Sequence, residues 1–288
     1  MDPIRLATFN VQCGHLLTGP AWADRRPLMR RSIELARADV LGLQEVLPST
    51  LGDMASLVAP LTLVPGPSTG PYRWSGSILS RERAQAGEHL PIAYRADRFE
   101  LYESGGFWVS ETPDKPGALL PLAPGPFLVH WVRLGLSDTP ESLLVLNAHF
   151  GHAPWHHAPT ARIVAEQLSR LEAAGAQNVD HPTSDTSVFL VGDFNALRSS
   201  ALLRSLTSPS GAGFVDGARS AAERTGPAVT FHWGRGATRL GLTLDYVLAR
   251  TPRRASRAEV IDQHEGWLYP SDHHLVVVEF GPPVNPPA

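Results

Sequence analysis

Polar side chains end four separate apolar segments of the sequence, and their types suit chemistry on an anionic substrate. Asn10 follows the segment IRLATF, Glu45 follows VLGLQ, and His149 follows LLVLNA. Asp193 and Asn195 close a fourth segment, VFLVGDFN. A single such residue is more simply a turn residue or a solvated acid. Four together indicate a site, because ligands of layered α/β proteins bind at the edge where several strands stop.

Two acidic residues and a histidine near the C-terminal end complete this polar set. Asp245 lies in TLDYVLA, and Asp272 with His273 lies just before the apolar segment LVVVEF. Carboxylate and amide oxygens can bind a hard divalent cation, and imidazoles and carboxylates can transfer protons. The residue types are therefore suited to cation binding and acid–base chemistry.

The elements that must position these residues are short apolar segments with few helices between them. Ten apolar runs are expected to be strands, at residues 4–9, 40–43, 75–79, 92–94, 107–109, 128–136, 143–146, 188–191, 242–248 and 275–280. Helical periodicity appears over residues 26–38 and 160–174, and Pro159 with Thr160 marks the expected start of the second helix. Many strands with few helices favour a layered α+β sandwich over a regular βαβ repeat.

Composition limits the classes of function. The chain has 288 residues, of which 43% are hydrophobic and 18% are charged, so it can bury a large core. Its net charge is −3 and Lys115 is the only lysine, which argues against sequence-independent binding of long nucleic acids. No apolar run reaches the roughly 18 residues of a membrane span, and the N-terminus lacks a signal-peptide pattern, so a cytoplasmic location is expected. The single cysteine excludes an intrachain disulfide.

The motifs together resemble those of one family. LATFN, LGLQEV, LNAHFGH, LVGDFNA, LDYVLA and SDHH are similar, in order and spacing, to motifs of the endonuclease/exonuclease/phosphatase superfamily of divalent-metal phosphoesterases. The resemblance covers essentially the whole chain. It implies a four-layer α/β/β/α sandwich of two mixed β-sheets flanked by helices, with the site at one edge. The segments GEHLPIAYR and GFWVSETPDKPG also resemble bacterial members that carry GE…PIFYR and FWLSETP.

The distribution of the motifs also predicts the domain organisation. The polar residues span positions 10 to 273 and need one fold to bring them together, and no segment resembles an interdomain linker. We therefore expect one domain of this type over residues 1–280. Residues 281–288, GPPVNPPA, are expected to form a proline-rich tail.

The family resemblance and the chemistry of the side chains both point to a divalent cation. Glu45, Asn10 and Asp272 would supply the hard oxygen ligands that suit Mg²⁺ or Mn²⁺, with Glu45 as the first ligand. Asp193 or Asn195 is a further ligand in one interpretation. We therefore expect Mg²⁺ or Mn²⁺ as the cofactor.

The remaining polar residues are expected to act on the substrate directly. His273 would be the base or an imidazole that contacts the phosphate, and Asp245 would orient it. In the other interpretation Asp193 activates the water and Asn195 orients it. His149 would donate to a phosphoryl oxygen and stabilise the transition state. Substrate contacts are expected from five loop or helix residues, Arg81, Glu88, His152, Trp155 and Arg162.

The chain departs from the family pattern at two positions. Gln12 stands where DNA-repair relatives carry an aspartate, which removes one supporting metal contact, and Gly151 replaces an acidic residue. His152, His156 and His157 form a local cluster that suggests zinc as an alternative. A loop cluster of histidines without a carboxylate more often contacts substrate or solvent, so we favour that interpretation.

The sequence thus predicts a Mg²⁺- or Mn²⁺-dependent phosphoesterase that hydrolyses a phosphodiester or phosphomonoester by direct attack of water, without a covalent enzyme intermediate. Its expected partner is a small phosphorylated or phosphodiester substrate, or an oligonucleotide, and no membrane. One alternative is a DNA or RNA nuclease of the same fold. An alternative of another class is a catalytically silent binding protein, which the intact polar set disfavours.

Overall fold

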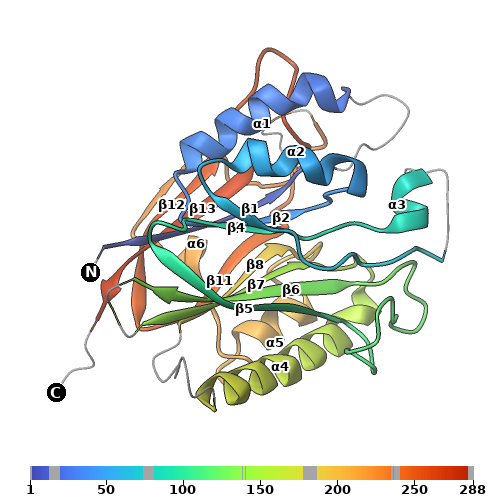
Figure 1. Ribbon diagram of the computed structural model, residues 1–288, viewed down its shortest axis with the longest axis vertical. Coiled ribbons are helices and arrows are strands. Elements are labelled where there is room, and N and C mark those ends of the chain that lie inside the picture. The colour runs from blue at the N-terminus through green and yellow to red at the C-terminus, as the bar shows by residue number, and fades with distance from the viewer. Residues whose placement is uncertain are drawn as a thin grey trace.

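Two β-sheets face each other and carry helices on their outer faces (Figure 1). The computed structural model describes residues 2–12, 20–73, 81–137, 139, 141–177, 187–234, 236 and 241–284. The arrangement is the four-layer α/β/β/α sandwich that the motifs predict. No helix within these ranges is long and apolar enough to cross a membrane.

The first sheet has seven strands in the order β10-β12-β13-β1-β2-β4-β3. These are β1 (Ile4–Asn10), β2 (Val40–Gln44), β3 (Thr62–Val64), β4 (Ile92–Tyr94), β10 (Glu223–Thr225), β12 (Arg253–Ile261) and β13 (Leu275–Pro283). β1 runs parallel to β2 and antiparallel to β13. The end of β1 therefore lies beside the end of β2 and the start of β13.

The second sheet has six strands in the order β5-β6-β7-β8-β11-β9. These are β5 (Phe99–Trp108), β6 (Leu128–Leu136), β7 (Ser142–His149), β8 (Ser187–Asp193), β9 (Val215–Asp216) and β11 (Asp245–Arg250). β8 pairs in parallel with β7, where His149 lies beside Asp193. It pairs in antiparallel fashion with β11, where Asp245 lies opposite Asp193. Three adjacent strands thus place three ionisable residues in one row.

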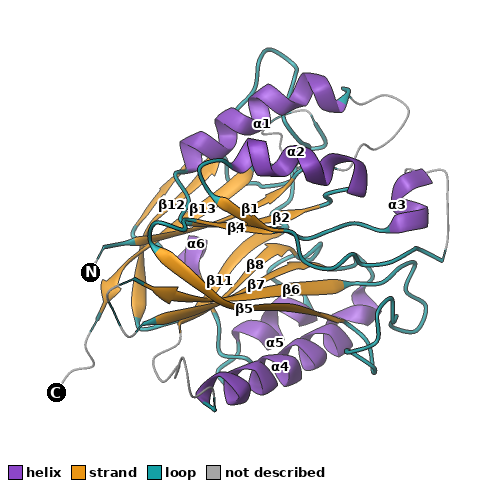
Figure 2. Cartoon of the chain, viewed as in Figure 1, coloured by secondary structure: helices purple, strands orange, loops and turns teal. Residues whose placement is uncertain are grey.

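Helices cover both outer faces of the sandwich. Figure 2 shows α1 (Trp22–Ala36) and α2 (Pro48–Val58) above the first sheet, and α4 (Pro154–Ala176) and α5 (Ala201–Thr207) below the second. Two shorter helices complete the fold, α3 (Arg81–Ala86) and α6 (Gly217–Ser220). α3 lies on the connection between β3 and β4, close to the strand ends described above.

The apolar core has three layers because successive residues of a strand point to opposite faces of its sheet. On β1, Ile4 and Leu6 pack between the two sheets, whereas Ala7 and Phe9 pack against the layer of α1 and α2. The strands of the second sheet divide their residues in the same way between the inter-sheet layer and α4. Full burial of each large apolar side chain contributes about 1.5–3 kcal/mol to folding.

The same alternation directs polar residues at the strand ends into the space between the sheets. Asn10 continues the inward series of β1, and Asp193 follows the inward-facing Phe189 and Val191 on β8. Asp245 precedes the inward-facing Val247 on β11. The strand register therefore brings side chains from both sheets together at one edge of the inter-sheet core.

The expected elements differ from the observed ones mainly at their ends, and the sequence did not predict α2, α5 or β12. α4 begins at Pro154, so the predicted start at Pro159 and Thr160 was wrong, and Pro159 lies inside the helix. Pro159 removes one backbone hydrogen bond and crowds the carbonyl group one turn earlier. Burial of α4 side chains such as Ile163 and Leu168 stabilises the helix across it. β13 continues to Pro283, three residues beyond the expected domain end. The predicted strand 75–79 and residues 285–288 lie outside the described residues, and the single-domain organisation stays a prediction.

Candidate active site

Asn10 connects the two sheets at the edge where the polar strand ends meet. Its Nδ2 donates to Asp193 Oδ2 at 3.0 Å and to Glu45 Oε1 at 3.2 Å. Its Oδ1 accepts the backbone N–H of Gln12 at 2.9 Å, which fixes the orientation of the amide. Asn10 and Asp193 are buried, and Glu45 is 9% exposed. The Asn10 amide thus bridges the expected ligand Glu45 and the carboxylate of Asp193.

The backbone around the site adopts conformations that most residues avoid. Glu45 has a φ of 62° and Asn195 a φ of 49°, both in the left-handed region. Gly192 has a φ of 146°, and a Cβ atom there would lie 1.9 Å from the carbonyl oxygen of Ala148 on the neighbouring strand. Gly192 therefore allows β8 to approach β7 closely just before Asp193. Unusual backbone conformations of this kind cluster at functional sites.

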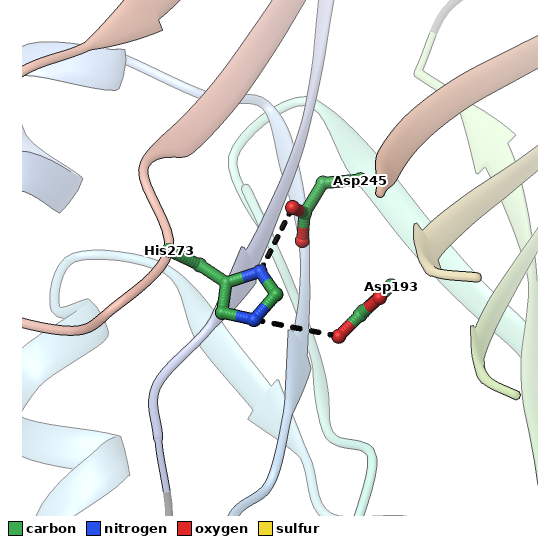
Figure 3. Close-up of side chains that lie close together, drawn as sticks. All are labelled: Asp193, Asp245 and His273. Atoms are coloured by element: carbon green, nitrogen blue, oxygen red, sulfur yellow. Dashed lines mark hydrogen bonds and ion pairs between the residues drawn. The ribbon is translucent and has the colours of Figure 1, made fainter. Parts of the chain in front are cut away.

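His273 and Asp245 form a buried pair (Figure 3). The Nδ1 atom of His273 lies 2.9 Å from Asp245 Oδ2. Thr230 Oγ accepts the backbone N–H of Asp245, and Ser271 Oγ accepts that of His273 and donates to the Asn10 carbonyl. Burial alone would lower the pKa of His273, but the charges of Asp245 and Asp193 outweigh it and raise this pKa well above 6.5. The two carboxylates therefore favour the imidazolium form of the ring.

His149 forms a second pair of the same kind with Glu88. Its Nδ1 lies 2.7 Å from Glu88 Oε1. Its Nε2 lies 3.0 Å from Asn195 Nδ2, a contact that favours the neutral ring. Burial also lowers the pKa of His149, but the charge of Glu88 and its hydrogen bond outweigh these effects and raise the pKa to about 9. Glu88, expected to contact substrate, is thus buried as the partner of His149.

Asp193 lies between the two histidines. Its Oδ2 is 3.6 Å from His273 Nε2 and 3.7 Å from His149 Nε2. The pKa of Asp193 is raised to about 6, mainly by burial. The positive charge of His273 opposes this increase, and the negative charge of Asp245 adds to it. Its Oδ1 accepts the backbone N–H of Asn195 at 2.8 Å. This carboxyl group can therefore exchange a proton near neutral pH.

Hard oxygen donors gather here in a pattern that fits a divalent cation. Asp193, Asp245 and His273 each offer a ligand atom, all within 4.8 Å of one another, among the residues that the structure describes. The buried Oδ1 of Asp245 has no hydrogen-bond partner in that part of the chain. Glu45 and Asn10 add a carboxylate and an amide beside this group. Such oxygen-rich sets suit Mg²⁺ and Mn²⁺.

Asp272 lies next to this group, directly before His273 in the sequence. Its backbone carbonyl accepts the N–H of His232 at 2.9 Å, and its Oδ1 lies 3.5 Å from Ser271 Oγ. Its negative charge contributes to the raised pKa of His273. Ser271, which binds the Asn10 carbonyl, connects the Asp272 segment to the end of β1.

The residues expected to contact substrate are two residues near the site, two residues on α4 and Arg81. Two lie near the site: Glu88, described above, and His152, whose pKa is lowered by partial removal from solvent and by the charge of His149. Trp155 on the first turn of α4 is 64% exposed, and Arg162 further along α4 forms ion pairs with Glu111 and Glu166. The side chain of Arg81 lies outside the described residues.

The histidine cluster expected near residue 152 does not gather around one point. His156 is buried, with Nε2 2.9 Å from the carbonyl oxygen of Pro121. The three-ligand group described above contains none of the three histidines. His156 is thus a buried residue of α4, which differs from the contact with substrate or solvent that the sequence suggested. Zinc binding by the three histidines has no support among the described residues.

Sequence reasoning missed two arginines that the structure places at the site. Arg83 on α3 is buried and forms ion pairs with Glu88 Oε2 at 2.9 Å and Glu45 Oε1 at 3.7 Å. Arg25 on α1 donates to the carbonyl oxygens of Val11 and Pro270, which connects the loop after β1 to the segment before Ser271. The sequence offered one hint of Arg83, which is its place as the last residue of the SRER segment at residues 80–83.

Comparisons with known proteins agree with this geometry. The model of the Endonuclease/Exonuclease/phosphatase family matches residues 7–273. A similar solved structure is an endonuclease/exonuclease/phosphatase family protein from Bacteroides thetaiotaomicron, with 22% identity, coverage of 96% of this chain and 94% of that chain, and a TM-score of 0.77. Another is a mannosyl-6-phosphatase from the same organism, with 21% identity, coverage of 96% and 99%, and a TM-score of 0.75.

A more distant likeness is to the human nocturnin catalytic domain with bound sulfate, at 18% identity, coverage of 98% and 96%, and a TM-score of 0.66. A comparison with curated protein sequences gives no match. The solved structures, at identities this low, show a shared fold. The match to the family model extends over nearly the whole chain and shows the family. The chain belongs to the endonuclease/exonuclease/phosphatase family of hydrolases that cleave phosphoester bonds.

Proposed function

We propose that this protein is a Mg²⁺- or Mn²⁺-dependent phosphoesterase that hydrolyses a small phosphomonoester or phosphodiester by direct attack of water. The observation that carries this proposal is the position of Asp193 Oδ2 between Nε2 of His149 and Nε2 of His273. A carboxylate that titrates near neutral pH beside two imidazolium rings can accept a proton while the rings hold an anionic substrate.

Glu45 and Asn10, with Asp272, are the proposed cation ligands. Hard oxygen ligands suit Mg²⁺ and Mn²⁺ better than an imidazole nitrogen. We therefore favour the carboxylate of Glu45 over the Asp193–Asp245–His273 group as the ligand set. When bound there, a divalent cation supplies neutralisation of the phosphoryl charge.

Asp193 is the proposed general base. Its pKa of about 6 leaves most of the carboxyl group ionised at neutral pH and able to take a proton from water. The backbone N–H of Asn195 binds Oδ1, and the Asn10 amide binds Oδ2. Proton transfer is proposed at Oδ2, because this oxygen also faces Nε2 of both histidines. His149 and His273 are held by Glu88 and Asp245 and would place N–H donors on the phosphoryl oxygens.

The charge of the protein favours a small substrate. The net charge of −3 and the single lysine argue against binding of long nucleic acids, whose affinity depends on positive charge. A phosphate group needs only the local positive charge of the two imidazolium rings and the cation. A nuclease of the same fold is the second candidate, and the cytoplasmic location expected from the sequence stays a prediction.

A panel of substrates tests the proposal. Purified protein would be incubated with p-nitrophenyl phosphate, bis-p-nitrophenyl phosphate, sugar phosphates, mononucleotides and single-stranded oligonucleotides, each with Mg²⁺, Mn²⁺ or EDTA. We expect cation-dependent hydrolysis of a small ester. Cleavage of oligonucleotides alone would favour the nuclease, and no hydrolysis of any substrate would favour a binding protein.

A further inference from the structure

Arg83 occupies a position that no proposed catalytic step uses. It lies on α3, is buried, and stacks its guanidinium 5.3 Å from the centre of the Tyr72 ring. The Tyr72 hydroxyl lies 3.4 Å from Nη2 of the same group. Tyr72 is held in turn against Gly125, where a Cβ atom would lie 2.0 Å from the tyrosine ring. The guanidinium therefore has a fixed aromatic face on one side.

The other side of the guanidinium meets two carboxylates with different roles. Nη2 lies 2.9 Å from Glu88 Oε2, and Nη1 lies 3.7 Å from Glu45 Oε1. Glu88 holds His149, whereas Glu45 contacts Asn10 and is the proposed first ligand of the cation. One arginine thus connects the histidine pair to the cation ligand.

The two distances differ in a way that matters for cation binding. The shorter ion pair holds Arg83 against Glu88, and the longer one places the same positive charge 3.7 Å from Glu45 Oε1. A positive charge near a ligand oxygen repels a divalent cation, and this repulsion is strong where water is largely excluded. Removing the charge should therefore increase the affinity of the site for the cation.

We propose that Arg83 is a positioning residue that acts as a built-in counter-cation of Glu45. It competes with the divalent cation for this carboxylate and so lowers the affinity of the site for the cation. It also holds Glu88 in place against Nδ1 of His149. This inference rests on the proposed function, because it takes Glu45 as a cation ligand. An arginine suits both tasks, since its planar fork can face two carboxylates at once, whereas a lysine offers a single point charge.

Direct measurement of Mn²⁺ binding by titration calorimetry tests the proposal without reference to turnover. Chelator-treated wild type would be compared with Arg83→Met, which removes the charge, and Arg83→Lys, which keeps it. We expect Arg83→Met to lower the Kd for Mn²⁺ roughly tenfold and Arg83→Lys to stay within about twofold of wild type. Arg83→Lys should still lower kcat, because a lysine cannot hold both carboxylates.

Two controls separate local charge from general effects. Arg30→Met removes the same charge from the exposed surface of α1, where Arg30 pairs with Glu34, and should leave the Kd for Mn²⁺ unchanged. Glu88→Gln should raise this Kd, because Arg83 loses the ion pair that draws it away from Glu45. Glu88→Gln also keeps the proposal testable if Arg83→Met does not fold, as judged by circular dichroism.

The outcomes distinguish this inference from the proposed function. An unchanged Kd for Mn²⁺ in Glu45→Gln would reject Glu45 as a ligand and with it the proposed cation site. Loss of Mn²⁺ binding in Glu45→Gln, together with unchanged or weaker binding in folded Arg83→Met, would reject only the role of Arg83. Tighter Mn²⁺ binding by Glu88→Gln would likewise contradict the proposed competition.

Discussion

His149 and His273 hold equivalent positions on opposite sides of the inter-sheet space. Each binds a carboxylate through Nδ1, and each turns Nε2 toward the same oxygen of Asp193, at 3.7 Å and 3.6 Å. His149 ends β7 of the second sheet, whereas His273 precedes β13 of the first. The proposed chemistry therefore depends on the two sheets keeping their register at this edge.

Asp245 and His273 should behave as one unit. Asp245→Asn and His273→Ala are each expected to lower kcat by about two orders of magnitude or more, because the carboxylate fixes the ring and sustains its positive charge. The double variant should be little worse than the worse single variant. Steady-state kinetics of the three proteins, with Asp272→Asn as a separate control for cation loss, would check this. Losses that multiply in the double variant would show that the two residues act independently.

The pH dependence of kcat/KM should be bell-shaped. Activity is expected to rise through about pH 6, as Asp193 loses its proton and becomes a base, and to fall above about pH 9, as His149 loses its charge. Glu88→Gln should move the alkaline limb to lower pH, because burial then lowers the pKa of His149 without an opposing charge. Glu82→Gln, which changes an exposed carboxylate of α3 bound to Ser49, is the matched control. An alkaline limb that stays in place in Glu88→Gln would argue against His149 as its source.

Two glycine substitutions should have opposite effects on stability. Gly192→Ala is expected to reduce the free energy of unfolding by about 2 kcal/mol or more, since its Cβ would lie 1.9 Å from the Ala148 carbonyl. Gly52→Ala in α2 meets nothing within 4 Å and should increase it by about 0.5–1 kcal/mol. Urea denaturation of both variants gives the values. Equal stability of Gly192→Ala and wild type would contradict the close approach of β7 and β8.

Salt should have little effect on hydrolysis of the preferred substrate. A small phosphoester engages only a few charges, whereas binding of long DNA releases many counterions and weakens steeply with salt. Rates on the best small ester and on supercoiled plasmid would be measured across a range of salt concentrations. Efficient plasmid nicking with a steep loss at high salt would favour the nuclease instead.

The convergence of the main polar residues could be predicted from the sequence because it depends on strand alternation. Asn10, His149 and Asp193 each follow an apolar segment, and strand periodicity directs them to one edge of the sandwich. Asp245 begins β11 at the same edge. The motif order then identified the family and with it the layered fold. These features depend on local patterns, which a sequence displays directly.

Other features depend on contacts between distant segments and were not predictable. The partnership of Glu88 with His149 joins residues 61 positions apart, and nothing in the GEHLPIAYR segment indicates which side chain points inward. Arg83 reaches the same cluster from a six-residue helix without a recognisable apolar period. β12 was missed because its sequence, RRASRAEVI, is mostly polar and half-exposed, as expected of a strand near the sheet edge.

The most direct test of the central claim is the rate of bis-p-nitrophenyl phosphate and p-nitrophenyl phosphate hydrolysis as Mn²⁺ is added to chelator-treated protein. Wild type, Glu45→Gln and the surface control Glu34→Gln would be compared, since Glu34 is exposed and pairs with Arg30. We predict no hydrolysis in EDTA, recovery with Mn²⁺ in wild type and Glu34→Gln, and a rate about a hundredfold lower in Glu45→Gln at every Mn²⁺ concentration. Equal rates in EDTA and Mn²⁺, or a Glu45→Gln rate equal to wild type, would contradict a cation-dependent site at Glu45.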